Sequence, residues 1–229
     1  MQAVIFAAGR GTRMKELTDT IPKSMLPILG RPILEHKITA LPKEIDEVIL
    51  VVSYLGSSIL NYFGGEFDGR RILYVEQENP VGGTADALWQ AKDILKGKFV
   101  AMNGDDLYAR EDIDACISAP EWAMLVEERD PVGAGGKVIV DSSGRVETIE
   151  EGVHEEKGLV NAGVYVIDER IFAYKPVPKG PGETELGLPQ TILQAVGEIP
   201  MRAVKSTLWI QITSPEDLKK AENILQGRA

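Results

Sequence analysis

The chain has 229 residues, of which 44% are hydrophobic and 26% are charged. This composition fits one large α/β domain and excludes disordered, collagen-like and coiled-coil proteins. The one cysteine, Cys116, excludes an internal disulfide and a zinc cluster built from cysteines, and the net charge of −10 argues against nucleic-acid binding.

The N-terminus combines an uncharged start with a basic segment. Met1–Gly9 lacks the basic start of a secretion signal and is far shorter than the ~18 residues of a membrane span, so we expect a soluble, cytoplasmic protein that binds no membrane. Residues 1–37 carry six basic and three acidic side chains, a net charge of +3. This local excess predicts either a site for a small polyanion or a chance cluster on a solvated face.

Apolar runs alternate with helical patterns in the first half of the chain. Ala3–Ala8, Val48–Val52 and Phe99–Met102 are continuous apolar runs, the pattern of strands buried on both faces. Between them, Pro32–Leu41 and Ala85–Leu95 have apolar residues at helical spacing. Strands that alternate with helices predict a mainly parallel sheet built from βαβ units.

The second half predicts strands in quick succession. Asp141–Gly144 has the residue types of a hairpin turn, and Lys175–Gly187 is rich enough in Pro and Gly to be a loop. Ser214 and Pro215 suit the N-cap and the first residue of a closing helix. We therefore expect a small antiparallel lobe attached to the parallel sheet. Its predicted strands are Ala123–Val126, Lys137–Val140, Arg145–Ile149 and Ala162–Ile167.

A glycine-rich turn follows the first predicted strand. In an open α/β sheet, ligands lie at the carboxyl ends of the strands, and Gly9 and Gly11 would let backbone N–H groups approach phosphate oxygens. The turn is not a dinucleotide fingerprint, because Met14 stands where that motif has a third glycine. It is not a Walker motif either, because Thr12 and Arg13 follow the second glycine.

The residues after this turn extend the motif. The chain reads FAAGRGTRM over Phe6–Met14, has a threonine at Thr18, and reads IPKSMLPILGRPIL over Ile21–Leu34. This pattern resembles that of the sugar-phosphate nucleotidylyltransferase family. The resemblance implies a Rossmann-like fold with a mixed, mainly parallel sheet flanked by helices. It also implies nucleotide-binding roles for Ala8, Gly9, Gly11 and Thr12, and catalytic roles for Arg13 and Lys23 in holding the triphosphate and stabilising the transition state.

The implied reaction depends on charge and needs no general base. Nucleotidyl transfer is an in-line displacement at the α-phosphorus by a phosphate oxygen that is already anionic, so fixed cations and backbone amides suffice. We expect His36 and His154, the two histidines of the chain, to be structural.

A second stretch, QENPVGGTADA over Gln77–Ala87, resembles the base-recognition segment of the family. A glutamine amide can donate to one base atom and accept from another, and glycines admit a flat ring. The resemblance implies nucleotide binding by Gln77, Gly82 and Thr84. The alternative is a loop followed by a helix that Thr84 caps.

Two positions are candidate Mg²⁺ ligands. Asp105 ends the third predicted strand, where a carboxylate suits a cation that bridges phosphates. The resemblance implies that Asp105 is a ligand and a catalytic residue, and that Asp106 is a local cap or a supporting group. The family's second ligand, an aspartate, is replaced here by Gln211, which offers an oxygen without a charge and should bind Mg²⁺ less tightly.

The acceptor side is implied by short matches to the same family. These assign acceptor binding to Gly136, Glu151 and Asn161. Gly152 stands where the family has the lysine that grips the sugar phosphate, and either Lys157 or Lys137 could substitute for it.

Together these features predict one nucleotidyltransferase domain over residues 1–229, with a nucleotide-binding half at 1–115 and an acceptor-binding half at 116–229. The expected reaction converts a nucleoside triphosphate (UTP or dTTP) and a hexose 1-phosphate into a nucleotide sugar and diphosphate. Gly152 motivates an alternative, a cytidylyltransferase acting on phosphocholine or inositol 1-phosphate. Gln211 and Gly152 together motivate a non-catalytic regulatory subunit that binds nucleotide sugars. We expect no second, acyltransferase activity of the kind that larger relatives carry, and a homo-oligomer is compatible with the sequence.

Overall fold

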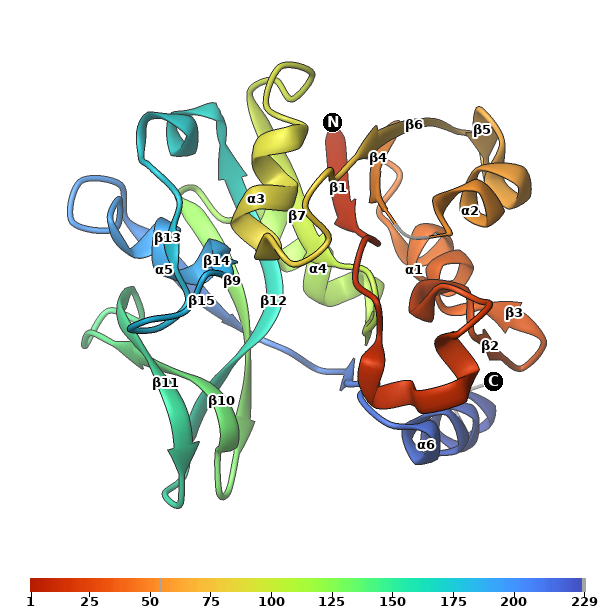
Figure 1. Ribbon diagram of the computed structural model, residues 1–229. Coiled ribbons are helices and arrows are strands. Elements are labelled where there is room, and N and C mark those ends of the chain that lie inside the picture. Colours follow the sequence, from red (N-terminus) through yellow and green to blue (C-terminus); the bar gives the residue numbers. More distant parts are fainter. Residues whose placement is uncertain (54, 228–229) are drawn as a thin grey trace.

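The computed structural model describes residues 1–53 and 55–227 and is built around one ten-stranded sheet (Figure 1). The strand order is β11-β10-β12-β7-β1-β4-β6-β5, with β9 alongside β12 and β15 alongside β9. The strands are β1 (Gln2–Phe6), β4 (Glu47–Val52), β5 (Glu66–Phe67), β6 (Arg70–Glu76), β7 (Lys98–Asn103), β9 (Trp122–Arg129), β10 (Gly133–Val140), β11 (Val146–His154), β12 (Gly158–Asp168) and β15 (Met201–Lys205).

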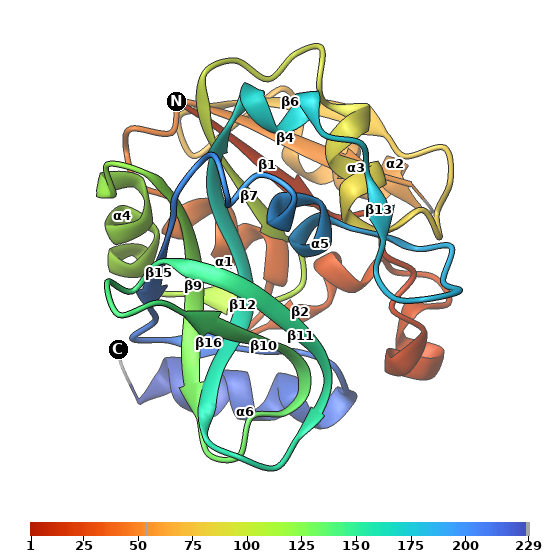
Figure 2. The ribbon, with the colours of Figure 1, turned by 90° about the vertical axis from the view of Figure 1, so that its left-hand side faces the viewer.

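Helices cover both faces of this sheet, with α4 on one side and α3 and α5 on the other (Figure 2). The α-helices are α1 (Ile33–Ala40), α2 (Gly56–Phe63), α3 (Gly83–Gln90), α4 (Arg110–Ser118), α5 (Leu188–Leu193) and α6 (Pro215–Gln226). Three short 3₁₀ helices are η1 (Thr12–Thr18), η2 (Lys23–Met25) and η3 (Glu169–Ala173). Six two-residue strands form three small pairs, β2 (Pro27–Ile28) with β3 (Arg31–Pro32), β8 (Leu107–Tyr108) with β16 (Trp209–Ile210), and β13 (Val177–Pro178) with β14 (Leu186–Gly187).

The two faces of the central strands pack into two separate cores. Ile5 of β1 joins one core with α1, α2 and α4, while its neighbour Val4 joins the other core with α3 and α5. Successive side chains of a strand point to opposite faces, so a strand covered by helices on both sides must be apolar throughout. This explains the continuous apolar runs of β1, β4 and β7, and it confirms the predicted mixed α/β sheet flanked by helices.

The predicted antiparallel lobe is part of the main sheet. β1 pairs in parallel with β4 and β7, and β4 pairs in parallel with β6. The second half of β12 pairs antiparallel with β7, and its first half pairs antiparallel with β10. One long strand therefore carries β9, β10 and β11 directly on the edge of β7, so the predicted antiparallel strands are attached to the parallel sheet and continue it.

Two predicted boundaries differ from the structure or are refined by it, and a third is confirmed. α3 ends at Gln90 and not at Leu95, because residues 91–94 form a turn in which the Ile94 N–H donates to the Ala91 carbonyl. The predicted loop at Lys175–Gly187 contains the β13–β14 pair. The closing helix α6 begins as predicted, with Ser214 as its N-cap and Pro215 in its first turn.

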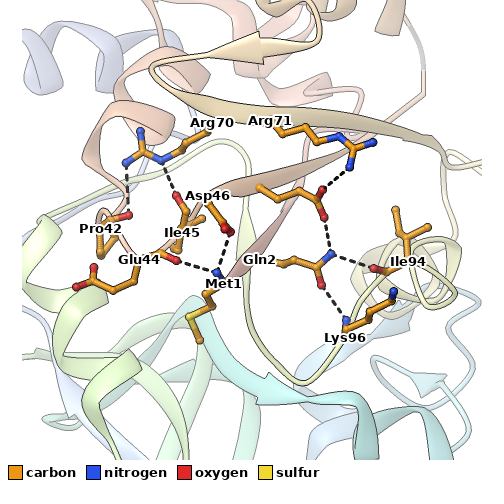
Figure 3. A network of polar contacts seen from close by, with 11 residues as sticks. Met1, Gln2, Pro42, Glu44, Ile45, Asp46, Arg70, Arg71, Ile94 and Lys96 are labelled. Atoms are coloured by element: carbon orange, nitrogen blue, oxygen red, sulfur yellow. Dashed lines mark hydrogen bonds and ion pairs between the residues drawn. The ribbon is translucent and has the colours of Figure 1, made fainter.

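The N-terminus is fastened at the amino edge of the sheet (Figure 3). The Met1 amino group donates to the Glu44 carbonyl and forms an ion pair with Asp46, both at 2.8 Å. The Gln2 amide donates to Glu47 at 2.6 Å and to the Ile94 carbonyl at 2.9 Å. These contacts hold the start of β1, so the glycine-rich turn lies at the opposite, carboxyl end of an anchored strand.

Candidate active site

A cleft of about 470 Å³ opens at the carboxyl ends of β1 and β7. Its walls come from the turn after β1, from the start of α3 and from the residues that follow β7. The structure brings together on these walls most of the predicted nucleotide and catalytic residues, namely Ala8, Gly9, Gly11, Thr12, Arg13, Lys23, Gln77, Thr84 and Asp105.

Gly11 allows the turn to pack tightly on Lys23. Its φ of 64° lies in the left-handed region that glycine adopts without strain, and a Cβ at this position would lie 2.8 Å from Cβ of Lys23. The hydroxyl of Thr18 donates to the Gly11 carbonyl at 3.0 Å and holds the turn from the other side. Met14 belongs to η1, the 3₁₀ helix that follows the turn. It is fully buried against α6 and holds η1 in place.

Lys23 and Asp105 meet on the cleft wall. Their Nζ and Oδ2 atoms are 2.5 Å apart, with the lysine side chain 9% exposed and the carboxylate 38% exposed. The Gly104 N–H donates to the Phe6 carbonyl at 3.0 Å, and a Cβ on Gly104 would overlap that carbonyl. The ends of β7 and β1 are thereby held together, which places a cation and an anion from residues far apart in sequence at one point.

A buried polar cluster lies behind Asp105. Asp106 is 4% exposed and accepts hydrogen bonds from Trp209 Nε1 at 3.1 Å and from the Ile212 N–H at 3.2 Å. Lys37 Nζ lies 4.2 Å from the centre of the Tyr108 ring and has no hydrogen-bond partner among the described residues. Burial raises the pKa of Asp106 and lowers the pKa of Lys37, while their mutual attraction opposes both shifts. Asp106 thus ties the segment after β7 to the segment around β16, in line with its predicted local role.

The segment after β6 positions Gln77 at the start of α3. Gln77 Nε2 donates to the Gly83 carbonyl at 3.1 Å and to Asp86 Oδ2 at 2.8 Å. Gly82 is the N-cap of α3 and does not line the cleft; a side chain at Gly82 would overlap the Asp86 carboxylate. The Thr84 hydroxyl accepts from the Leu188 N–H at 3.0 Å. Because α3 begins at Gly83, Thr84 lies inside the helix, and the interpretation of Thr84 as the helix cap is wrong.

The predicted acceptor residues lie together on β10, β11 and β12, outside the lining of this cleft. Gly136 pairs with Glu151, and a Cβ on Gly136 would lie 3.1 Å from Glu151 Oε1. Continuing the β10–β12 register by one residue sets Asn161 beside Gly136. The Asn161 amide donates to the Tyr165 hydroxyl at 2.7 Å and accepts from the Gly163 N–H at 3.0 Å. The three residues therefore form one row across the sheet.

Gln211 lies next to an arginine that the sequence analysis did not single out. The pairing of β16 with β8 brings the residue after Ile210 to the level of the Asp105–Asp106 segment. Arg129 Nη1 donates to Gln211 Oε1 at 3.4 Å, and its guanidinium carbon lies 4.3 Å from the centre of the Trp209 ring. Arg129 also forms an ion pair with Glu127 at 2.7 Å. A guanidinium therefore stands beside the neutral amide that replaces the second aspartate of the family pattern.

The two lysines that could replace the family lysine at Gly152 have partners of their own. Lys137 Nζ pairs with Glu156 at 2.5 Å, and Lys157 pairs with Glu128. Lys137 and Arg129 lie on one face of the sheet, because Lys137 pairs with Val160, which in turn pairs with Glu127, two residues before Arg129. The same alternation sets Gly152 on that face, since Lys137 pairs with Glu150. Glu128, the partner of Lys157, points to the opposite face.

Two further polar residues near the predicted groups carried no sequence signal. Glu185 lines the cleft from the segment that was expected to be only a loop. Gln190, on α5, donates to Glu151 Oε1 at 2.8 Å. Both reach their places through contacts between segments far apart in the sequence.

The donor atoms of the cleft fit a sparingly ligated Mg²⁺. No group of three or more His, Cys, Asp and Glu side chains suited to a metal ion occurs in the part of the chain that the structure describes. Mg²⁺ commonly uses one or two carboxylates together with substrate phosphates and water, so the accessible carboxylate of Asp105 at a phosphate-sized cleft meets that requirement.

Among the described helices, none is both long and apolar enough to cross a membrane.

Comparison with known proteins places the whole chain in one family. Residues 2–226 match the family model named Nucleotidyl transferase. The chain is 30% identical over 226 residues to the bifunctional protein GlmU of Methanocaldococcus jannaschii, covering 98% of this chain and 54% of that protein, so it spans about half the length of this relative. It is 32% identical over 237 residues to the UTP–glucose-1-phosphate uridylyltransferase AglF of Haloferax volcanii, covering 99% and 97% of the two chains.

Solved structures show the same fold at lower sequence identity. The inositol-1-phosphate CTP transferase from T. maritima superposes with a TM-score of 0.80 at 21% identity, over 98% of this chain and 94% of that one. With the family model and the AglF match extending over nearly all of its length, the chain belongs to the nucleotidyl transferase family, among its sugar-phosphate nucleotidyltransferases.

Proposed function

We propose that the protein transfers a nucleotidyl group from a nucleoside triphosphate, UTP or dTTP, to a hexose 1-phosphate, with release of diphosphate. The observation that carries the proposal is the convergence of the glycine-rich turn, Lys23 and Asp105 on one cleft. The uridylyltransferase AglF, which this chain matches over nearly its full length, supports a uridine donor.

The proposed roles follow from the charge that the reaction moves. The backbone N–H groups of the turn at Ala8, Gly9, Gly11 and Thr12 would hold phosphate oxygens, and Arg13 and Lys23 would neutralise the charge that develops on the leaving diphosphate. The base would bind beside Gln77, Gly82 and Thr84. Gly82 would act indirectly, because its missing side chain leaves room for the Asp86 carboxylate. Holding two anions in line lowers the barrier without a general base.

We propose Asp105 as the anionic ligand of Mg²⁺ and Gln211 as a weaker oxygen ligand. Bound Mg²⁺ would supply charge neutralisation on the phosphates. Asp105 now pairs with Lys23, so the ammonium would be released toward the nucleotide as the carboxylate takes a cation. The Arg129 guanidinium beside Gln211 disfavours a second positive charge at the Gln211 oxygen, which makes Asp105 the principal ligand.

The acceptor would bind along the second half of the chain. We propose that residues 116–229 form the acceptor-binding half and residues 1–115 the nucleotide-binding half of one domain. Gly136, Glu151 and Asn161 would contact the sugar, and Arg129 would contact its phosphate in place of the lysine missing at Gly152. We further propose that the protein works in the cytoplasm on these two small substrates, without nucleic acid.

A matrix of donors and acceptors tests this function. UTP, dTTP, GTP, CTP and ATP are each combined with hexose 1-phosphates, phosphocholine and inositol 1-phosphate, and diphosphate release is followed over time. We expect steady release with UTP or dTTP and a hexose 1-phosphate, and loss of that release in Asp105→Asn but not in Asp93→Asn, an exposed acid at the far edge of the sheet. Release only with CTP and another phosphomonoester would favour the cytidylyltransferase, and binding without release under every pair would favour the regulatory subunit.

A further inference from the structure

The amide of Gln77 has one orientation available to it. Its Nε2 donates to the Gly83 carbonyl at 3.1 Å and to Asp86 Oδ2 at 2.8 Å. Both partners are acceptors, so turning the amide over would set its oxygen against two other oxygens. Both hydrogens of this nitrogen are therefore used inside the protein.

The oxygen of the same amide is what Gln77 offers to a ligand. Gln77 is 4% exposed and lines the cleft. Among the described residues, none donates a hydrogen bond to its Oε1, and this oxygen is not one of the fully buried unpaired atoms. Gln77 can therefore accept a hydrogen bond from a ligand in the cleft through Oε1, but it has no free N–H to donate.

Asp86 imposes this orientation. It lies in the first turn of α3, where the helix dipole favours a carboxylate, and Gly82 leaves the space that the carboxylate fills. A carboxylate can only accept hydrogen bonds, so it holds the Gln77 nitrogen toward itself. An asparagine at the same position could also donate, so only the Gly83 carbonyl would then oppose the turned amide of Gln77.

We propose that Asp86 is a specificity-determining residue: by holding Gln77 as an acceptor, it selects nucleotides whose base carries a hydrogen on the ring nitrogen that faces Gln77. Uracil and thymine carry that N–H at N3, and guanine carries it at N1. Cytosine and adenine have a lone pair at the equivalent atom, which would meet the Gln77 oxygen unfavourably. The inference rests on the proposed function, in which Gln77 meets the base.

Equilibrium binding separates this proposal from the transfer reaction, because no turnover is needed. Isothermal titration calorimetry compares UTP with CTP, two pyrimidine nucleotides of nearly equal size, on the wild-type protein, Asp86→Asn and the control Asp93→Asn. We expect the wild type and the control to bind UTP at least about tenfold more tightly than CTP, the value of one well-placed hydrogen bond. Asp86→Asn should reduce that ratio to about threefold or less, because one of the two acceptors that fix the Gln77 amide is replaced by a group that can also donate.

Two results would overturn the proposal. One is a wild-type protein that binds CTP as tightly as UTP, a result that does not depend on whether the variant folds. The other is an Asp86→Asn protein with a wild-type unfolding midpoint and an unchanged ratio. Failure of the proposed function would appear differently, as a preserved UTP preference without diphosphate release from any acceptor.

Discussion

At the scale of single residues, the ion pair between Lys23 and Asp105 defines the chemistry of the cleft. The Lys23 ammonium and the Asp105 carboxylate neutralise each other at 2.5 Å. A nucleotide with its cation would offer the ammonium a phosphate and the carboxylate a metal ion, so the pair can separate without leaving either charge unpaired. Removing either partner alone would leave the other charge without its counter-ion.

Arg129 provides a test of the acceptor side. We expect Arg129→Ala to raise the KM for the acceptor roughly ten- to hundredfold, with a much smaller change in the KM for the nucleotide. Loss of a hydrogen bond to a charged group costs about 1.5–3 kcal/mol, which accounts for this range. Steady-state kinetics with each substrate varied in turn measures the two constants.

The matched control for this prediction is Lys157→Ala. Lys157 pairs with Glu128, which points away from the face that carries Gly152 and Arg129, so we expect a much smaller rise in the acceptor KM than for Arg129→Ala. Arg129→Lys should restore part of the acceptor affinity, because it keeps the charge but not the planar fork. An acceptor KM that rises for Lys157→Ala and not for Arg129→Ala would show that Lys157 is the substitute.

The residues of the site could be predicted where they follow one another in the sequence. Gly11 and Lys23 belong to a nearly continuous motif, and the structure confirms that they lie on one cleft. The contact of Arg129 with Gln211 joins residues 82 positions apart, and no local pattern marks it. The Gln77–Asp86 contact spans only nine positions, yet it depends on where α3 begins, which the sequence alone did not determine.

At the scale of elements, the start of α6 shows how a capping sequence stabilises a helix. Asp217 Oδ2 accepts from the backbone N–H groups of Thr213 and Ser214 at 3.0 and 2.9 Å, and Lys220 adds an ion pair at 3.0 Å. Burial acts to raise the pKa of Asp217, but these hydrogen bonds outweigh it and hold the pKa well below the usual 3.8. The capping box therefore stabilises the folded state through an ionised carboxylate.

We expect Asp217→Asn to lower the free energy of unfolding at neutral pH by about 0.5–2 kcal/mol, the usual value of a helix cap. The folded-state pKa lies below the unfolded value, so this stabilisation is complete above about pH 5 and is lost as pH falls through and below 3.8 toward the folded-state pKa. Urea unfolding of both proteins from pH 7 to pH 3 measures the difference.

The same series includes Asp93→Asn as a control, which should unfold like the wild type. A stability difference between Asp217→Asn and the wild type that stays constant with pH, or grows in acid, would mean that the carboxylate is not the stabilising group.

The elements that could be predicted were those with one clear pattern. β1, β4 and β7 are buried on both faces and read as unbroken apolar runs, and α6 carries its cap in its first residues. β6 (Arg70–Glu76) was missed because its apolar centre is short and flanked by charged residues. β15 (Met201–Lys205) was missed because Arg202 and Lys205 leave an apolar run of two residues between them. The union of β12 with β7 could not be predicted, since pairing between distant strands leaves no mark in either one.

At the scale of the whole molecule, the sheet holds the two proposed halves in a fixed relation. β7 ends in the Asp105 segment, and its neighbour β12 leads to the row of Gly136, Glu151 and Asn161. The strands that position the nucleotide and those that would position the acceptor therefore belong to one hydrogen-bonded sheet (Figure 1). A rigid scaffold of this kind suits a reaction that depends on holding two anions in line.

The central claim is that the turn after β1 and Lys23 grip the triphosphate, and a crystal structure with a non-hydrolysable UTP analogue and Mg²⁺ tests it most directly. We expect the phosphate oxygens to lie within hydrogen-bonding distance of the backbone N–H groups between Gly9 and Thr12 and of Lys23 Nζ, with Asp105 turned toward the cation. Phosphates bound at another edge of the sheet, with this turn making no contact to the nucleotide, would contradict the account.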